Sequence, residues 1–245
     1  MVFEPAFVLL LVSAVFAGML DATVGGGGFV IIPFLVFTGN TIQLAIGTSR
    51  LIFLLDSFSA VLGHARKRNI DYRLALCYTI PSVIGAPVGA YVTSTTSSET
   101  ISKVFGFFML AMLFLIACRP DFGLKDRKPR RLLPSFIAGL LIGFMIGLLG
   151  GGVGILIIML MVFVSGTTVL LASGTSQVVV WLTNIVTLIA YQQRGFVDVR
   201  MGLILGLTAF LGAQVGVLVA HKVGNIWLRR LLMAVTVVSA LKLLL

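Results

Sequence analysis

Apolar segments long enough to cross a membrane follow one another along most of this chain, and two of them are broken by consecutive glycines. Of its 245 residues, 59% are hydrophobic and only 11% are charged, and the mean hydropathy is +1.13. Soluble domains carry roughly 25% charged residues, so a soluble fold of this composition would lack polar side chains to cover its surface. A bilayer accepts such segments as helices of about 20 residues. We therefore predict an all-α fold, a polytopic bundle of transmembrane helices.

The predicted helices form two similar series on either side of a basic stretch. Within residues 1–118, the apolar segments are 5–24, 29–37, 41–63, 72–92 and 100–118. Within residues 132–245, they are 132–149, 153–164, 169–192, 199–220 and 226–244. We interpret the two series as transmembrane repeats, and the basic stretch at 119–131 as a cytoplasmic linker between them.

Short motifs recur in the two series at a fixed offset. Gly47-Thr48-Ser49 recurs as Gly174-Thr175-Ser176, 127 residues later. The same offset carries Asp71, Arg73, Gly85, Ala86 and Gly89 onto Asp198, Arg200, Gly212, Ala213 and Gly216, while the glycine runs align at an offset of 125. Chance similarity between apolar segments explains matching leucines and valines, but not these motifs. We therefore predict an internal duplication.

Lysine and arginine residues in the loops predict the orientation, because cytoplasmic loops are enriched in them. The loop at 64–71, the neighbouring Arg73 and the linker are basic and are expected in the cytoplasm, whereas the turn at 93–98 is expected outside. If the short piece after each glycine run counts as a crossing, the two repeats are inverted; if each broken segment crosses once, they are parallel. Inversion is favoured because inverted repeats with broken helices recur in secondary transporters. It would place Arg194 and Arg200 outside.

The glycine runs at 25–28 and 150–152 are the strongest functional signal. Glycine costs about 1 kcal/mol relative to alanine inside a helix, so several in succession are expected to unwind it. Unwound backbone survives at membrane depth only where protein, water or a ligand supplies hydrogen-bond partners. Amide groups at the start of the half-helices that Phe29 and Val153 open are suited to bind an anion. The alternative is that small residues merely allow close helix packing.

Polar residues follow the Gly-Thr-Ser motifs, which we interpret as helix starts. Their hydroxyls either cap the helices or contribute to the binding site. Arg50 in the first repeat is a functional candidate, since a guanidinium binds an oxyanion through two parallel hydrogen bonds; the alternative is that it snorkels to the outer interface. The candidate substrate ligands are Gly25, Gly26, Gly27, Gly28, Thr48, Ser49, Arg50, Gly150, Gly151, Gly152, Thr175, Ser176 and Gln177.

Two acids, Asp21 and Asp56, lie within apolar segments. Each is a candidate to pair with Arg50 or to carry a proton in a coupled cycle. Asp56 follows Arg50 by six residues, about 120° around a helix, so pairing between Asp21 and Arg50 across helices is favoured. The alternative for Asp21 is a structural cap or ion pair. His64, beside the basic loop, is expected at the membrane interface.

Several other functions have no support in the sequence. It contains no Ser/His/Asp grouping, P-loop or metal-spaced cluster of His, Cys and Glu, so an enzyme, a metal site and a cofactor are not expected. The formal charge of +10 lies in a few loops and indicates topology rather than nucleic-acid binding. Cys77 and Cys118 are expected to be small buried side chains. Asp71 and Asp198 are expected to cap the helices that follow them.

Taken together, these motifs resemble those of the TauE/SafE family of membrane transporters over nearly the whole chain. The resemblance rests on the first glycine run with Pro33, on Gly47-Thr48-Ser49, on the loop from His64 to Asp71, and on the second glycine run with Gly174-Thr175-Ser176. Asn69 stands where the loop usually has glycine. Ile158 stands where the first repeat has proline, so the two halves of the site need not be equivalent.

The resemblance implies a transporter of sulfite, sulfoacetate or other sulfonates, an exporter in many members, in the inner membrane of a bacterial cell. The hypothesis is alternating access at a midplane site between the two glycine runs. A passive anion channel and a membrane scaffold subunit without flux of its own are the alternatives. The expected partners are a small anion and the lipid bilayer, with a coupling proton or sodium ion and a homodimer left open.

Overall fold

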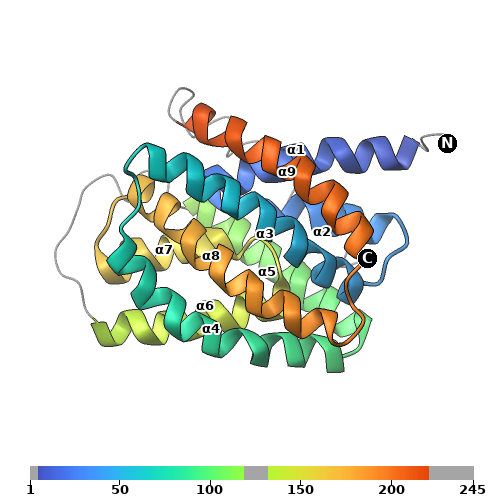
Figure 1. The fold of residues 1–245 in the computed structure, drawn as a ribbon. Helices are drawn as coiled ribbons and strands as arrows, with labels where there is room; N and C mark the ends of the chain where they lie inside the picture. Colours follow the sequence, from blue (N-terminus) through green and yellow to red (C-terminus); the bar gives the residue numbers. More distant parts are fainter. Residues whose placement is uncertain (1–4, 119–131, 221–245) are drawn as a thin grey trace.

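The computed structural model describes residues 5–118 and 132–220 as helices joined by short turns, without a strand in these two ranges. The predicted linker at 119–131 and the predicted last segment at 226–244 lie outside the described residues. The described helices are α1 (Pro5–Val24), α2 (Gly28–Phe37), α3 (Ile42–Arg66), α4 (Tyr72–Thr95), α5 (Ser98–Cys118), α6 (Leu132–Leu149), α7 (Val153–Ser165), α8 (Val169–Gln192) and α9 (Val199–Ala220). They pack into one bundle (Figure 1).

The predicted segments and the observed helices agree closely, because the apolar runs end where polar caps and turns begin. Asp71 and Asp198 cap α4 and α9 as predicted, their carboxylates accepting hydrogen bonds from the backbone N–H groups of Leu74 and Met201 at 3.0 and 2.9 Å. Helices α3, α4, α8 and α9 have the length and apolar composition of membrane-crossing helices. The chain is therefore a multi-pass membrane protein.

The prediction that the Gly-Thr-Ser motifs start helices is wrong. Helix α3 begins earlier, and its cap is Thr41, whose hydroxyl accepts a hydrogen bond from the N–H of Leu44 at 3.3 Å. Thr168 caps α8 in the same way, accepting from Leu171 at 3.4 Å. The Gly-Thr-Ser motifs therefore lie inside their helices, nearly two turns after the caps, and their side chains are buried.

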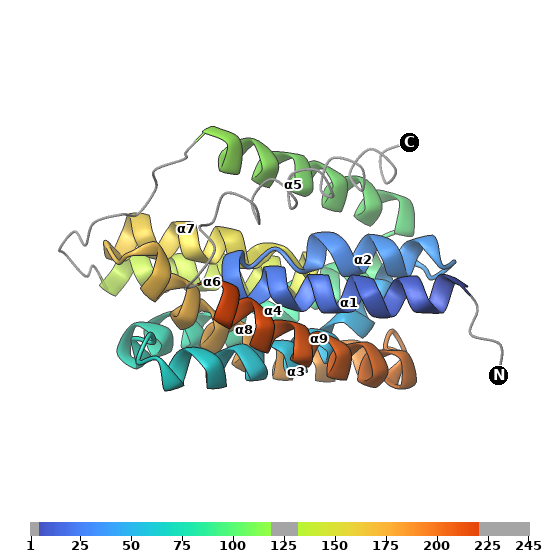
Figure 2. The same cartoon turned by 90° about the horizontal axis from the view of Figure 1, so that it is seen from above.

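The glycine runs are turns, and each broken segment doubles back on itself. Helix α2 returns alongside α1, toward the end of the bundle at which α1 begins (Figure 2). A Cβ atom on Gly27 would collide with the carbonyl oxygen of Ala17, ten residues earlier, which requires the chain to reverse. Helices α6 and α7 form the second hairpin, entering from the opposite end (Figure 1). Each hairpin therefore starts and finishes on one side.

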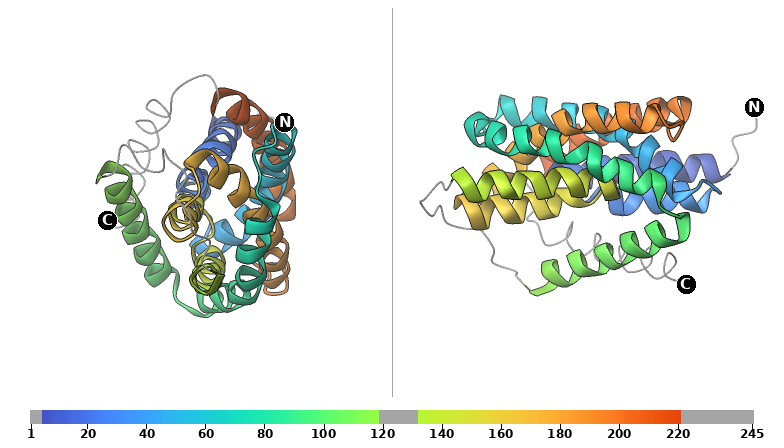
Figure 3. Two further views of the ribbon diagram at one scale, coloured as in Figure 1. Left: turned by 90° about the vertical axis from the view of Figure 1, so that its left-hand side faces the viewer. Right: turned by 90° about the horizontal axis from the view of Figure 1, so that it is seen from below.

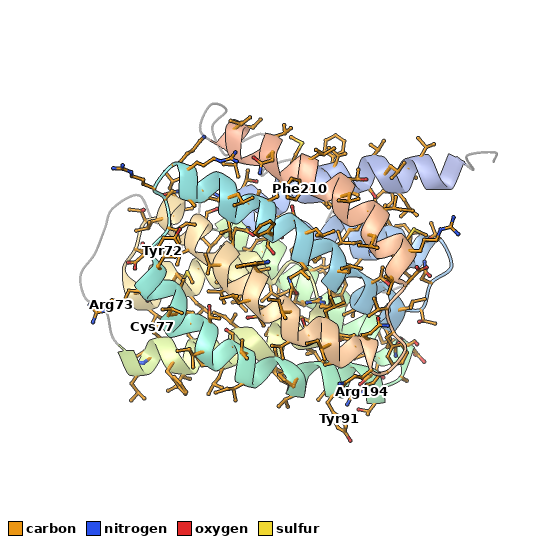
Figure 4. All side chains as sticks on the ribbon, in the orientation of Figure 1. Tyr72, Arg73, Cys77, Tyr91, Arg194 and Phe210 are labelled. Carbon is orange, nitrogen blue, oxygen red and sulfur yellow. The ribbon has the colours of Figure 1, made fainter. Side chains whose placement is uncertain are left out.

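This reversal supports the inverted arrangement of the two repeats. Helices α3 and α8 run in opposite directions, as do α4 and α9 (Figure 1). Arg73, at the start of α4, and Arg194, in the turn after α8, lie at opposite ends of the bundle (Figure 4). Arg194 stacks over the ring of Tyr91, with its Cζ 5.0 Å from the ring centroid, at the end of α4.

Helix contacts occur in pairs that follow the sequence offsets between the repeats. Glycines of α4 receive the backbone of α6, and the equivalent glycines of α9 receive the backbone of α1. Under these offsets Gly85–Leu140 matches Gly212–Val15, Gly89–Phe144 matches Gly216–Met19, and Gly143–Ser82 matches Gly18–Ala209. The paired contacts support the predicted duplication, and they show that these glycines allow backbones to pack closely.

Helix α5 lies at the side of the bundle, beside the hairpins rather than between them (Figures 2 and 3). Its contact with α2 is aromatic: the ring of Phe29 lies 6.4 Å from that of Phe105 and 6.0 Å from that of Phe108, both in edge-to-face geometry. Phe29 follows the first glycine turn directly. The aromatic cluster therefore holds the tip of the first hairpin against α5.

Inversion predicts that Arg73 and Arg194 are accessible from opposite sides of the membrane. Both side chains are exposed. We expect single Arg73→Cys and Arg194→Cys variants, made in a chain with Cys77 and Cys118 replaced by serine, to react with a membrane-impermeant maleimide from opposite faces. Intact cells and inside-out vesicles provide the two faces. Labelling of both positions from the same face would contradict the inverted arrangement.

Candidate functional site

The tips of the two hairpins meet in the middle of the bundle, glycine against glycine. A Cβ atom on Gly28 would overlap the backbone of Gly151, and one on Gly25 would overlap that of Gly154. Gly25, Gly150 and Gly152 also have positive φ values of 74°, 89° and 77°, which side chains disfavour. Glycine is therefore required at the tips for two reasons: the turn within each hairpin needs positive φ values, and the crossing between the hairpins leaves no room for side chains.

An acid occupies the first hairpin tip. Asp21, at the end of α1, packs its side chain against Gly27, and its backbone carbonyl oxygen accepts a hydrogen bond from Nε2 of Gln177 at 2.7 Å. The N–H groups of Phe29 and Val30 bond to the carbonyl oxygens of Gly26 and Gly27 at 3.1 and 3.0 Å. The positive end of α2 therefore already has a resident anion and backbone acceptors.

Asp56 of α3 faces the carboxyl group of Asp21. The two carboxyl groups lie close enough for their charges to interact, and Asp56 is fully buried with neither of its carboxyl oxygens hydrogen-bonded. The expected direct ion pair between Asp21 and Arg50 does not form, since Arg50 hydrogen-bonds instead to Ile46, Ile146, Asn184 and Ser49. An ion pair does join Lys103 to Glu99, at the exposed start of α5. Arg50 acts on Asp21 electrostatically, without contact.

Arg50 is fully buried, so it does not snorkel to the outer interface. Its Nη1 donates to the carbonyl oxygen of Ile146 at 3.0 Å and to Oδ1 of Asn184 at 3.2 Å, and its Nε donates to the carbonyl oxygen of Ile46 at 3.2 Å. Nη2 carries two N–H groups but has one acceptor among the described residues, the hydroxyl of Ser49 at 3.4 Å. The guanidinium therefore keeps donor capacity on the Nη2 side.

That donor side faces the second hairpin tip. A Cβ atom on Gly150 would collide with Nη2 of Arg50, so this glycine makes room for the guanidinium. Helix α7 begins just beyond, with Gly152 as a cap that offers no side-chain acceptor. In the described part of the chain, the N–H groups of Gly154 and Ile155 make no backbone hydrogen bond. The second hairpin tip therefore has the Arg50 guanidinium against Gly150, and the backbone of Gly154 and Ile155 against Gly25 of the first tip.

Equivalent residues of the two repeats make equivalent contacts with different chemistry. Arg50 donates to the carbonyl oxygen of Ile146, and its counterpart Gln177 donates to that of Asp21 at 2.7 Å. Ile146 is itself the counterpart of Asp21 under the offset of the glycine runs. The first repeat therefore supplies all the charged groups of the centre, while the second supplies amides and apolar groups. The Oε1 atom of Gln177 is buried without a partner.

Thr48 and Thr175 lie away from this centre and hold the opposite ends of the bundle. The hydroxyl of Thr48 accepts a hydrogen bond from the N–H of Asp198 at 3.0 Å, and that of Thr175 accepts one from the N–H of Asp71 at the same distance. The hydroxyl of Ser176 donates to its own helix instead, to the carbonyl oxygen of Ser173 at 2.7 Å. A ligand role for these three hydroxyls stays a prediction.

Two further polar residues belong to this region, and sequence reasoning missed the first. Asn184, which accepts from Arg50, lies two turns after Gln177 on α8, and its position within an apolar helix was the available signal. His64, in the last turn of α3, is buried within the protein, while its expected place at the membrane interface stays a prediction. Its Nε2 lies 3.1 Å from the carbonyl oxygen of Ala22, at the end of α1. Its counterpart Tyr191 bonds to Gly147 in the same way, at 2.7 Å.

Helices broken inside a helical membrane bundle, with buried ionisable residues beside the breaks, are typical of secondary transporters. The family described as "Sulfite exporter TauE/SafE" matches residues 10–243. The chain belongs to this family of membrane transporters, and it is accordingly a transporter rather than an enzyme.

Relatives in other organisms carry matching descriptions. A "Probable membrane transporter protein ORF9" of Sinorhizobium is 30% identical, with 96% of this chain and 91% of the relative covered. The "Probable membrane transporter protein YunE" of Bacillus subtilis is 27% identical, with 89% of each covered. A "Probable membrane transporter protein" of Methanocaldococcus jannaschii is 26% identical, with 97% of this chain and 95% of the relative covered. The similarity therefore extends over both repeats.

The contact between Gly150 and Arg50 predicts an unequal effect of two matched substitutions. Gly150 and Gly39 have φ values of 89° and 93°, but only Gly150 has a neighbour where a Cβ atom would lie. Gly150→Ala and Gly39→Ala should each cost about 1–2 kcal/mol for the left-handed backbone. Gly150→Ala should cost about 1–3 kcal/mol more for the collision with Arg50. Thermal unfolding of the detergent-purified variants measures the difference, and equal shifts would contradict the contact.

Proposed function

We propose that this chain is a secondary transporter that exports small sulfur-containing anions, such as sulfite or organosulfonates, by alternating access. The observation that carries the proposal is the donor side of Arg50 at the tip of the second hairpin. A buried cation without a contacting carboxylate is costly in a membrane protein. A substrate anion at Nη2 would supply the directly contacting, hydrogen-bonded anion that Arg50 lacks.

The chemistry of this place suits an oxyanion of small size. The planar guanidinium matches a carboxylate, sulfonate or sulfite group through parallel hydrogen bonds. The unbonded N–H groups of Gly154 and Ile155 lie at the positive end of the 13-residue helix α7, which favours the same charge. The family description names sulfite. Sulfur oxyanions are therefore the substrate class that we propose.

Alternating access is supported by the two hairpins, which enter from opposite ends and meet at their glycines. The polar centre is closed from both sides here, since Arg50, Ser49, Asp56 and Gln177 are at most 1% exposed. The two Thr–Asp hydrogen bonds, Thr48 with Asp198 and Thr175 with Asp71, close equivalent positions at opposite ends. Breaking one while the other holds would open the centre to one side at a time.

The alternatives make different predictions for flux. A passive anion channel would give single-channel currents and flux that does not saturate. A scaffold subunit would give no flux, and sulfite or a sulfonate would not stabilise the purified protein against heat. Saturable flux in proteoliposomes that hold the purified chain alone separates the proposed transporter from both.

Replacement of Arg50 tests the proposed anion site. Arg50→Gln installs the residue that the second repeat has at this position, so packing should be preserved while the charge is lost. Loss of charge-assisted hydrogen bonds should weaken the interaction with the anion by about tenfold to a hundredfold. Arg50→Lys keeps the charge but loses the fork, so intermediate activity is expected. The measurement is efflux of sulfite or methanesulfonate from loaded proteoliposomes.

The matched control is Arg194→Gln, which removes one exposed arginine from the end of the bundle. It should leave the apparent affinity unchanged. If Arg50→Gln transports with wild-type affinity, Arg50 does not bind the anion and the site assignment is wrong.

A further inference from the structure

The buried pair of carboxyl groups at the first hairpin tip has no role in the anion site described above. Asp21 of α1 and Asp56 of α3 are both buried, and they lie close enough together for their charges to interact. Both oxygens of Asp56 and Oδ2 of Asp21 are buried without a hydrogen-bond partner. Two neighbouring carboxyl groups buried in this way cannot both be ionised without a large cost, so we infer that they hold at least one proton between them.

A second, independent group points to the same place. Gln177 of α8 is 1% exposed and directs its amide to Asp21, where Nε2 donates to the backbone carbonyl oxygen at 2.7 Å. Its Oε1 has no partner. Oε1 of Gln177 and Oδ2 of Asp21 are thus both buried acceptors without a donor. A further proton on the pair would supply a donor to this region, because a protonated carboxyl group can donate a hydrogen bond.

Few other ionisable groups belong to the helices packed around the pair. Arg50 is the cation that acts on Asp21. His64, on α3, has Nε2 near a carbonyl oxygen and Nδ1 3.3 Å from the amide nitrogen of Asn69, which suits a neutral ring. The remaining ionisable groups of α3, α5, α8 and α9 are Arg66 at the end of α3, Glu99, Lys103 and Cys118 on α5, Tyr191 on α8 and Arg200 at the start of α9. Helices α2 and α7 have none.

The buried charges can be balanced in two ways. Without substrate, Arg50 contributes one positive charge and a singly protonated pair contributes one negative charge, so the centre is neutral. When a monovalent anion binds to Arg50, the centre becomes negative unless the pair takes up a second proton. An unbalanced charge at membrane depth is expensive. Anion binding and binding of the second proton therefore favour each other, by linkage between the two sites.

We propose that the Asp21–Asp56 pair is the proton-binding site that couples anion transport to proton transport in the same direction. This inference rests on the proposed anion site at Arg50. Each monovalent anion carries one proton with it, so the transport cycle is electroneutral. Net export then requires an outward gradient of the anion that is steeper than the inward gradient of protons.

The experiment uses the full chain in proteoliposomes with a pH-sensitive dye inside. Methanesulfonate is the probe because it is a permanent monovalent anion and cannot carry a proton itself. An imposed inward gradient of labelled methanesulfonate should acidify the lumen, with one proton entering per anion. Clamping the membrane potential at different values should not change the rate of methanesulfonate uptake. Movement of the anion without acidification, or flux driven by a sodium gradient instead of a pH gradient, would overturn the inference.

The decisive variant is the double substitution Asp21→Asn and Asp56→Asn, which imitates the doubly protonated pair in shape and charge. We expect it to exchange labelled methanesulfonate across the membrane without moving protons. Wild-type acidification by this variant would overturn the inference. The matched control is Thr183→Val, at the position equivalent to Asp56 in the second repeat, where a buried hydroxyl also has no partner. It should keep wild-type coupling.

Failures of the two proposals are distinguishable. If the wild-type chain moves neither sulfite nor methanesulfonate, the proposed function is wrong and the coupling falls with it. If the anion moves and Arg50→Gln weakens the transport, but protons do not follow the anion, the anion site stands and only the inference is overturned. The wild-type stoichiometry separates these two cases even if the double variant does not fold.

Discussion

The crossing of two glycine turns, backbone against backbone, is the contact on which the rest of this structure depends. Each turn reverses the chain inside a membrane, where an open turn would leave N–H and C=O groups without partners. Because Gly25 and Gly28 lie directly against Gly154 and Gly151, each tip covers the other. Any side chain at these contacts would drive the hairpins apart and expose polar backbone at the centre of the bundle.

The close crossing also determines where charge can be accommodated. The tips bring the first turns of α2 and α7 to one depth, and residues of α3 and α8 reach them from the side. Arg50 and Gln177 extend in equivalent ways to the ends of α6 and α1, yet only one of them is charged. The scaffold is thus close to symmetric while its chemistry is not. Asp21, Arg50 and Asp56, the buried charged residues of the described chain, all belong to the first repeat.

This asymmetry separates two tasks that a symmetric site would combine. The second tip, with Gly150 and Arg50, has hydrogen-bond donors to offer. The first tip has acceptors, because the carboxyl group of Asp21 occupies the end of α2 and faces Asp56. The donors of the second tip favour an anion, and the acceptors of the first tip favour a proton. Exchange of a few side chains between otherwise equivalent positions is enough to produce this difference.

The sequence by itself determined the membrane class, the helix limits and the family, because these follow from local properties: the length of apolar runs, the position of polar caps and the order of motifs. It also identified Arg50, Asp21 and Asp56 as unusual, since ionisable residues in apolar helices stand out individually. Which of them lie together was decided only by the tertiary structure. The expected Asp21–Arg50 ion pair gave way to the Asp21–Asp56 pair, because the hairpin crossing brings Asp21 to α3 one and a half turns beyond Arg50. The Gly-Thr-Ser motifs were misplaced as helix starts for the same reason: local sequence offers several possible caps, and packing of neighbouring helices selects the one that is used.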